Sequence, residues 1–300
     1  MVKIKVAIIG YGNIGRYVLD AVQEAPDFEL TGVVRRPSSI SNNPLELSNI
    51  KVTSNLRELE KIDVAIICAP SREVTKFARE ILSMGINTVD SYDIHTDIWK
   101  FKKELETVAV KNNAVALISA GWDPGSDSIV RALFQAMAPQ GITYTNFGPG
   151  MSMGHSTAVK SLPGVKNALS LTIPLGTGVH RRMVYIELKE GFSFEEVAAT
   201  IKADEYFVHD ETHVIQVDDV NKLIDMGHGV KMERKGVSGK SHNQLFEFNM
   251  KINNPALTAQ VLVCAARASK KQKPGCYTLI EIPVIDLLYG EKEELIRKLV

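Results

Sequence analysis

The sequence has no excess of charge of either sign, because it contains 35 basic and 35 acidic residues among 300. A protein that binds nucleic acid normally carries a basic excess or a basic stripe, so this class is disfavoured. No apolar run approaches the length of a transmembrane helix. The apolar segment that opens the chain is too short for a signal peptide and leads into a glycine turn. We therefore expect a cytoplasmic protein.

Cysteine is also scarce, with only Cys68, Cys264 and Cys276 in the chain. The number is odd, and no two of these residues form a CxxC pair, so neither a disulfide framework nor a zinc site is predicted. Their neighbours are apolar or small. We interpret the three cysteines as buried small hydrophobic residues and expect no metal cofactor.

The first 120 residues alternate short apolar runs with helical segments. The run at 63–69 is almost continuously apolar, as expected of a strand that is buried on both faces of a parallel sheet. This rhythm predicts an α/β fold with a Rossmann-type doubly wound parallel sheet and right-handed crossovers. The predicted strands are 2–9, 30–35, 63–69, 87–89 and 114–119, and the predicted helices are 16–25, 73–84 and 96–111.

The pattern changes after Gly125. Apolar and polar residues alternate along 245–252, which is typical of a strand with one wet face. We predict a second, α+β domain with an open mixed or antiparallel sheet, and a helix at 256–270 that packs back on the first domain. The predicted domains are 1–120, with 255–300 packing onto it, and 121–254. The further predicted strands are 142–147, 168–173, 183–188 and 214–217.

A glycine-rich turn follows the first predicted strand and opens a helix, which is the context that a dinucleotide site requires. Its residues are Gly10, Tyr11, Gly12, Asn13, Ile14 and Gly15. Gly10 and Gly12 permit a tight turn and close approach of the pyrophosphate, and Gly15 lets the helix pack on the strand. The N-terminus of the helix offers N–H donors to the phosphates.

The end of the second strand indicates which dinucleotide binds. NAD-binding chains usually carry an acidic residue there, which holds the ribose 2′-hydroxyl. This chain carries Arg35 and Arg36, which suit a 2′-phosphate, so we predict NADP. The alternative is that both arginines lie on a solvated loop. The residues expected beside the nicotinamide half of the cofactor are Cys68, Ala69, Pro70, Ser71, Ser91, Tyr92, Ala120, Gly121 and Pro124.

Two further motifs each place an aspartate after a strand of the parallel sheet. Asp93 lies in Ser-Tyr-Asp-Ile-His, and Asp123 lies in Gly-Trp-Asp-Pro-Gly. Two carboxylates beside a redox cofactor favour a substrate that carries amines. The alternative role for Asp123 is to cap the helix that follows it. The alternative role for the nearby Asp90 is only to stabilise its loop.

Taken together, several segments resemble the meso-diaminopimelate D-dehydrogenases over nearly the whole chain. They are GYGNIG, the paired arginines, VDSYDIH, SAGWDPG, FGPGMSMGHS, GVHRRM and INNPALTA. The resemblance implies a cytoplasmic, NADP-dependent homodimer in which 121–254 also serves dimerisation. It implies oxidative deamination of the D-centre of meso-2,6-diaminopimelate to L-2-amino-6-oxopimelate, which cyclises to tetrahydrodipicolinate. The reverse reaction is reductive amination.

The resemblance also implies a role for individual residues. Asp93 and Asp123 lie near the D-centre, and Trp122 walls the pocket. Phe147 packs on the substrate stem. The remaining residues are Ser152, Met153 and Gly154 for the D-carboxylate, Thr172, Arg182 and His228 for the distal L-carboxylate, and Asn254 for the distal amine. Arg181 and Arg182 alternate on one strand, so only one of them faces the substrate.

Only nine residues separate Thr172 from Arg182. Some members of the family carry an insertion in this interval, so the chain resembles a shorter subgroup with broader acceptance of D-amino acids. We therefore expect simple D-amino acids to be slow substrates.

Two other functions remain open from the residues. The first is another two-domain NADP enzyme of amino-acid biosynthesis. Aspartate-semialdehyde dehydrogenase would need a nucleophilic cysteine in a polar site, which neither Cys264 nor Cys276 provides, and the histidine–lysine motif of dihydrodipicolinate reductase is missing. The second is a non-catalytic NADP sensor that has kept the fold.

Overall fold

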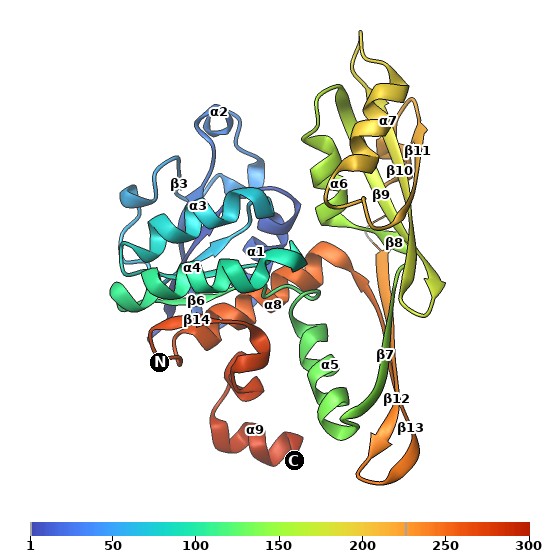
Figure 1. Cartoon of the computed structure of the whole chain (residues 1–300). Helices are drawn as coiled ribbons and strands as arrows, with labels where there is room; N and C mark the ends of the chain where they lie inside the picture. Colours follow the sequence, from blue (N-terminus) through green and yellow to red (C-terminus); the bar gives the residue numbers. More distant parts are fainter. Residues whose placement is uncertain (1, 226) are drawn as a thin grey trace. The chain divides into compact units, whose positions relative to one another are not determined.

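The computed structural model describes residues 2–225 and 227–300, which form two compact units (Figure 1). The first unit comprises Met1–Ile129 and Ala256–Val300, and the second comprises Val130–Pro255. The chain therefore passes between them inside two helices, α5 (Ser126–Met137) and α8 (Asn254–Ser269). Across the described residues, no helix combines the length and the apolar character needed to cross a membrane.

The first unit contains a seven-stranded sheet in the order β14-β6-β5-β4-β1-β2-β3, and every recorded strand pair in it is parallel. The predicted doubly wound parallel sheet is thus confirmed. The C-terminal segment supplies the edge strand β14, which pairs with β6. The strands are β1 (Ile4–Ile9), β2 (Phe28–Val34), β3 (Val52–Thr53), β4 (Val64–Ile67), β5 (Asn87–Asp90), β6 (Val115–Leu117) and β14 (Gly275–Tyr277).

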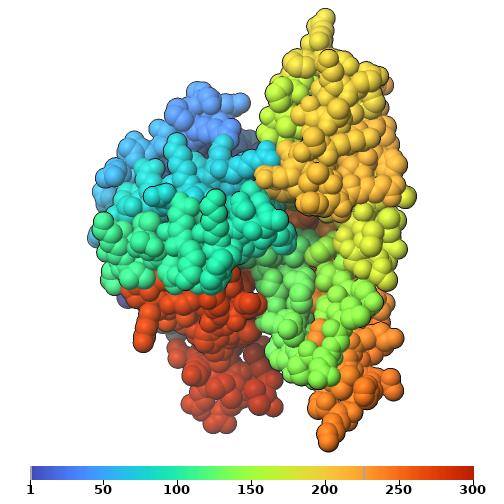
Figure 2. All heavy atoms as spheres, in the orientation of Figure 1, coloured from blue at the N-terminus to red at the C-terminus, as the bar shows by residue number. Residues whose placement is uncertain are grey.

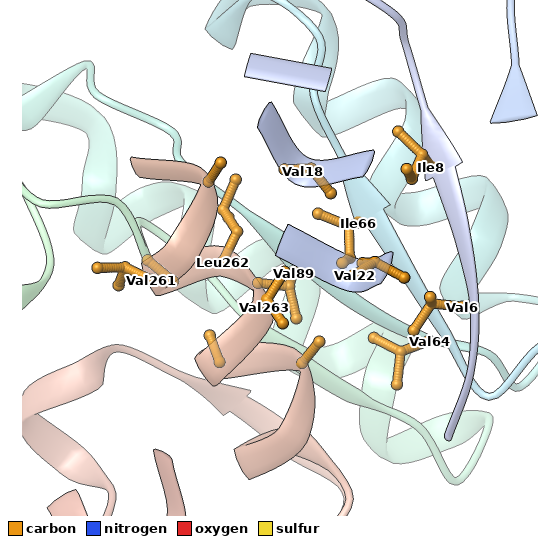
Figure 3. Close-up of a cluster of buried hydrophobic side chains, with 14 of the residues drawn as sticks. Val6, Ile8, Val18, Val22, Val64, Ile66, Val89, Val261, Leu262 and Val263 are labelled. Carbon is orange, nitrogen blue, oxygen red and sulfur yellow. The ribbon is translucent and has the colours of Figure 1, made fainter. Parts of the chain in front are cut away.

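Helices cover both faces of this sheet. Successive side chains of a strand point to opposite faces, so Val6 and Ile8 pack with α1 (Asn13–Glu24) and α8. Figure 3 shows them beside Val18 and Val22 of α1. The alternate residues of β1 pack with α3 (Ser71–Leu82) and α4 (Ile98–Lys111). The outer surface of these two helices is cyan to blue-green in Figure 2.

The second unit contains two sheets, where one was predicted. The first has the order β11-β10-β9-β8 and is mixed, because β10 and β11 are parallel. The second has the order β13-β12-β7 and is antiparallel. The predicted α+β class is confirmed. The strands are β7 (Gln140–Phe147), β8 (Gly150–Met151), β9 (Val165–Gly176), β10 (Val179–Leu188), β11 (Glu211–Gln216), β12 (Gly227–Ser238) and β13 (Ser241–Asn253).

Two helices of the second unit pack on its mixed sheet. They are α6 (Met153–Lys160) and α7 (Phe194–Ala203), which bury Val159, Val197 and Ile201 against residues of β9 and β10. The Ser193 hydroxyl accepts a hydrogen bond from the Glu196 N–H, so it caps the start of α7. Two short helices complete the first unit, namely α2 (Pro37–Ile40) and α9 (Lys292–Leu299).

Candidate active site

The glycine-rich turn has the geometry that a dinucleotide needs. Gly10 has a φ of +95°, and a Cβ there would lie 2.8 Å from the Cys68 carbonyl oxygen. A Cβ on Gly15 would lie 2.4 Å from the Gly10 carbonyl oxygen, so α1 can approach β1 only because this residue is glycine. A Cβ on Gly12 would meet nothing within 4 Å, which leaves open space in front of the turn.

The N-terminus of α1 lies at this open space. Its N-cap is Gly12, which has no side chain to cap the first turn, and the first turn carries no acidic residue. The N–H groups of a first turn have no partner within the helix and can bind phosphate oxygens. Tyr11 and Ile14 pack against the core of the unit. The turn therefore fits a dinucleotide pyrophosphate, mainly through its main chain.

Arg35 and Arg36 follow β2 but have different surroundings. The Arg35 guanidinium lies 5.8 Å from the centroid of the Tyr11 ring, next to the glycine turn, and donates to Asn43 Oδ1 over 2.5 Å. Arg36 forms an exposed ion pair with Glu73 over 3.3 Å. Arg35 is thus the cation nearer to the turn, while Arg36 already has an acidic neighbour.

The segment Cys68–Ser71 follows β4 at the same edge of the sheet. Burial raises the pKa of the Cys68 thiol, and it does the same for Cys276. Thiols with raised pKa values stay protonated at neutral pH and are poor nucleophiles. Neither residue therefore suits the nucleophilic cysteine that an aspartate-semialdehyde dehydrogenase needs.

Ser71 and Asp93 hold each other in place. The Ser71 hydroxyl donates to Asp93 Oδ1 over 2.6 Å, and the Asp93 N–H donates to the Ser71 oxygen over 3.2 Å. The start of α3 thus fixes the loop that follows β5. The Tyr92 ring stacks on Phe101 with 4.3 Å between centroids and packs in the core of the unit.

The loops after β5 and β6 are joined directly, which brings the two aspartate motifs together. The Ala120 N–H donates to the Asp90 carbonyl over 2.7 Å. Beyond it, Asp123 Oδ2 lies 4.0 Å from His95 Nε2, which belongs to the first motif. The Asp123 side chain is 13% exposed, and Trp122 beside it is buried. The two carboxylates therefore lie on neighbouring loops of one unit, at the carboxyl ends of parallel strands.

Arg182 lies at the centre of a polar group in the second unit. Its strand β10 pairs with β9 so that Arg182 lies opposite Thr172, and the guanidinium donates to the Thr172 hydroxyl. The guanidinium Nε also donates to Asp210 Oδ2 over 2.6 Å. The neighbouring Arg181 instead pairs with Glu211 over 3.0 Å. The two arginines thus have separate partners, and Arg182 is the less exposed, at 13% against 39%.

Two histidines lie near Arg182. Burial, with a smaller contribution from the charge of Arg182, lowers the pKa of His228 to about 4. Burial and Arg182 also lower the pKa of His180, whose Nε2 accepts the Phe147 N–H over 2.8 Å. Both imidazoles are therefore neutral at neutral pH, and each can donate one N–H to a carboxylate without adding charge.

The resemblance assigns Ser152, Met153 and Gly154 to the D-carboxylate, which their main-chain N–H groups would bind. The Ser152 N–H donates to the Ser170 carbonyl over 2.9 Å, so this group already has a main-chain acceptor. Met153 and Gly154 form the first turn of α6, where helical geometry leaves N–H groups without an intrahelical partner. The buried Asn254 amide donates to the Met151 carbonyl over 3.0 Å and so supports this turn from α8.

Sequence reasoning missed the partners of these residues. Asp210, His180 and the Ser71–Asp93 pair all depend on contacts between segments that are distant in the chain. One signal was present for Asp210, because Asp210 and Glu211 are consecutive acids and the two arginines on β10 are consecutive bases. Across the described ranges, no three His, Cys, Asp or Glu residues are placed to hold a metal ion.

Two family models match the chain in succession. "Oxidoreductase family, NAD-binding Rossmann fold" matches residues 4–116. "Diaminopimelic acid dehydrogenase C-terminal domain" matches residues 121–181. The second match contains Trp122, Asp123 and Thr172.

Relatives match over the full length. The chain is 67% identical over 300 residues to the meso-diaminopimelate D-dehydrogenase of Bacteroides fragilis, with 100% of each chain covered. The structure of the C. glutamicum DAP dehydrogenase in complex with DAP has a TM-score of 0.86 and 28% identity, with 100% of each chain covered. An engineered D-amino acid dehydrogenase bound to NADP⁺ has a TM-score of 0.89 and 27% identity, again with 100% of each chain covered.

Proposed function

The chain belongs to the meso-diaminopimelate D-dehydrogenase family, and from that membership we propose that it oxidises the D-centre of meso-2,6-diaminopimelate with NADP⁺. Water then releases ammonia and leaves L-2-amino-6-oxopimelate, which cyclises to tetrahydrodipicolinate. The reverse direction is a reductive amination that serves diaminopimelate and lysine biosynthesis. The observation that carries the proposal is the juxtaposition of the Asp93 and Asp123 loops at the edge of the sheet that bears the glycine turn.

The residues of the first unit fit NADP. The open space at Gly12 and the uncapped first turn of α1 suit the pyrophosphate, and Arg35 beside Tyr11 suits the 2′-phosphate. When bound, NADP⁺ supplies the acceptor for the hydride that leaves the D-centre. The protein contributes the orientation of that carbon and the exclusion of water.

The D-centre changes its protonation and charge during the reaction. The amine must be neutral when the C–H bond breaks, so its proton has to leave first. We propose that Asp93 and Asp123 hold the amine and accept this proton through water. Ser71 keeps one Asp93 oxygen in a hydrogen bond, which fixes the direction of the other. The same carboxylates then orient the water that adds to the imine.

The distal end of the substrate carries a carboxylate and an amine. Arg182 with Thr172 and the neutral His228 form a donor set for the carboxylate. Asn254 is proposed for the distal amine, the first turn of α6 for the D-carboxylate and Phe147 for the stem. We further propose that the protein is a cytoplasmic homodimer, as the family resemblance implies.

The experiment that tests this function records reduced nicotinamide at its absorbance band. The purified protein is mixed with NADP⁺ and each stereoisomer of diaminopimelate in turn. We expect turnover with the meso isomer and little with the L,L isomer. Silence with every isomer, in protein that binds NADPH, would contradict the proposal and leave a reductase of another substrate or an NADP sensor.

A further inference from the structure

Arg182 has a carboxylate partner from the protein itself. Its Nε donates to Asp210 Oδ2 over 2.6 Å, and the two side chains are only 13% and 23% exposed. Asp210 directly precedes β11, which pairs in parallel with the strand of Arg182. The ion pair is therefore built into the sheet of the second unit and does not depend on a ligand.

The charges around Arg182 balance without a ligand. Asp210 offsets the guanidinium, while His228 and His180 are neutral at neutral pH because their pKa values are lowered. Thr172 contributes an uncharged hydroxyl. Arg181, next along the strand, is offset separately by Glu211. Without Asp210, the positive charge of the Arg182 guanidinium would have no partner on the protein among these residues. A substrate carboxylate would then have to offset it.

The neutralisation of Arg182 by Asp210 determines which substrates can bind beside the guanidinium. A partly buried guanidinium left without a carboxylate is strongly unfavourable, so an arginine that depended on the substrate would reject ligands that lack a distal carboxylate. With Asp210 present, such a ligand leaves no unpaired charge. A distal carboxylate must share the guanidinium with Asp210, and the two anions repel each other, which weakens the preference for it.

We propose that Asp210 is a specificity-determining residue, which stands in for the substrate's distal carboxylate at Arg182 and so admits D-amino acids whose side chains end without a carboxylate. This inference rests on the proposed function, because it assumes that Arg182 receives the distal end of a D-amino acid. It adds a residue and a substrate class to that function.

The test compares Asp210→Asn with the wild-type protein at pH 7 and saturating NADP⁺. Asparagine keeps an oxygen that accepts from Arg182 Nε but removes the charge. We expect the ratio of kcat/KM for meso-diaminopimelate to that for D-norleucine to rise at least tenfold. The rise should come from a lower KM for the first substrate and a higher KM for the second. The matched control is Glu211→Gln, which removes the charge beside Arg181 and should leave the ratio within about twofold.

Two results would overturn the proposal. One is an unchanged or lower ratio in Asp210→Asn. The other needs no variant: wild-type protein that oxidises meso-diaminopimelate but shows no turnover with D-norleucine or D-alanine at 100 mM. If the variant fails to fold, the turnover of the wild-type protein with D-norleucine and D-alanine still tests the proposal. Loss of turnover with every diaminopimelate isomer in the wild-type protein would instead contradict the proposed function, so the two failures are distinguishable.

Discussion

The carboxylate of Asp90 accepts a hydrogen bond of 3.1 Å from the main-chain N–H of Ser119, which links the end of β5 to the end of β6. The same oxygen accepts the Tyr92 N–H over 3.0 Å. Asp90 is fully buried, and burial raises its pKa to about 7 although both hydrogen bonds lower it. The buried Asp90 carboxylate therefore holds the main chain of the loop that contains Asp93 and of the loop that leads to Asp123.

The raised pKa of Asp90 makes the stability of the protein depend on pH. In the unfolded chain an aspartate titrates near 3.9, so between about pH 4 and 7 the folded state holds more protons than the unfolded state. The free energy of unfolding therefore falls as pH rises through this window. Asp90→Asn keeps the acceptor oxygen but cannot ionise. Relative to this variant, we expect wild-type protein to lose up to about 4 kcal/mol between pH 4 and 8.

Urea unfolding at a series of pH values measures this difference. Asp93→Asn is the control, because it removes a carboxylate from the same loop without touching the Asp90 hydrogen bonds. The interpretation fails if the wild-type and Asp90→Asn profiles run parallel across the whole range.

Two similar substitutions in the glycine turn should affect different properties, the first NADPH binding and the second stability. Gly12→Ala places a Cβ where nothing lies within 4 Å, so the melting temperature should stay the same. The methyl group occupies the space proposed for the pyrophosphate, so the Kd for NADPH should rise about tenfold or more. Gly15→Ala places a Cβ 2.4 Å from the Gly10 carbonyl oxygen and should destabilise the fold by about 1–3 kcal/mol.

Thermal unfolding and a fluorescence titration with NADPH separate these two effects. Normal NADPH binding by Gly12→Ala would mean that the pyrophosphate does not pass in front of this turn. An unchanged melting temperature for Gly15→Ala would mean that α1 can move away from β1 without cost.

The parallel sheet could be predicted because its central strands are short apolar runs buried on both faces. Strand β12 was not predicted, although it is central in the antiparallel sheet. From Val230 onward its buried residues alternate as Val230, Met232 and Arg234, so a charged residue interrupts the apolar pattern. The Arg234 guanidinium donates to the Ala138 carbonyl at the end of α5, over 2.8 Å from Nε. Local sequence carries no sign of this contact, because its two ends lie 96 residues apart.

The candidate site shows the same limit. Asp93, Asp123 and Arg182 could be assigned to the substrate from their local motifs and from the resemblance to the family. Their hydrogen-bond partners Ser71 and Asp210 depend on how α3 and β11 pack in the folded chain. Strand β14 could not be predicted either, because Gly275–Tyr277 is too short to show a strand pattern and is recognised only by its pairing with β6.

The choice of NADP over NAD should depend on the arginines after β2, and unequally. Arg35 lies beside the Tyr11 ring, whereas Arg36 is paired with Glu73 over 3.3 Å. Replacing both by alanine should reduce the preference for NADP by about 1–3 kcal/mol, the scale of hydrogen bonds to charged groups. Arg35→Ala alone should account for most of this loss, because the 2′-phosphate must compete with Glu73 for Arg36.

Glu73→Gln makes that competition measurable. It removes the anion that neutralises Arg36, so NADPH affinity should increase by a few-fold, within the range of an exposed ion pair, while NADH affinity should not change. The kcat/KM values for both cofactors, measured with the three variants and the wild-type protein, separate the contributions of the two arginines. If the NADP/NAD ratio is the same in the double variant as in the wild type, other residues hold the phosphate. If Glu73→Gln raises the affinity for both cofactors equally, Glu73 acts on the pyrophosphate that they share and not on the 2′-phosphate that distinguishes them.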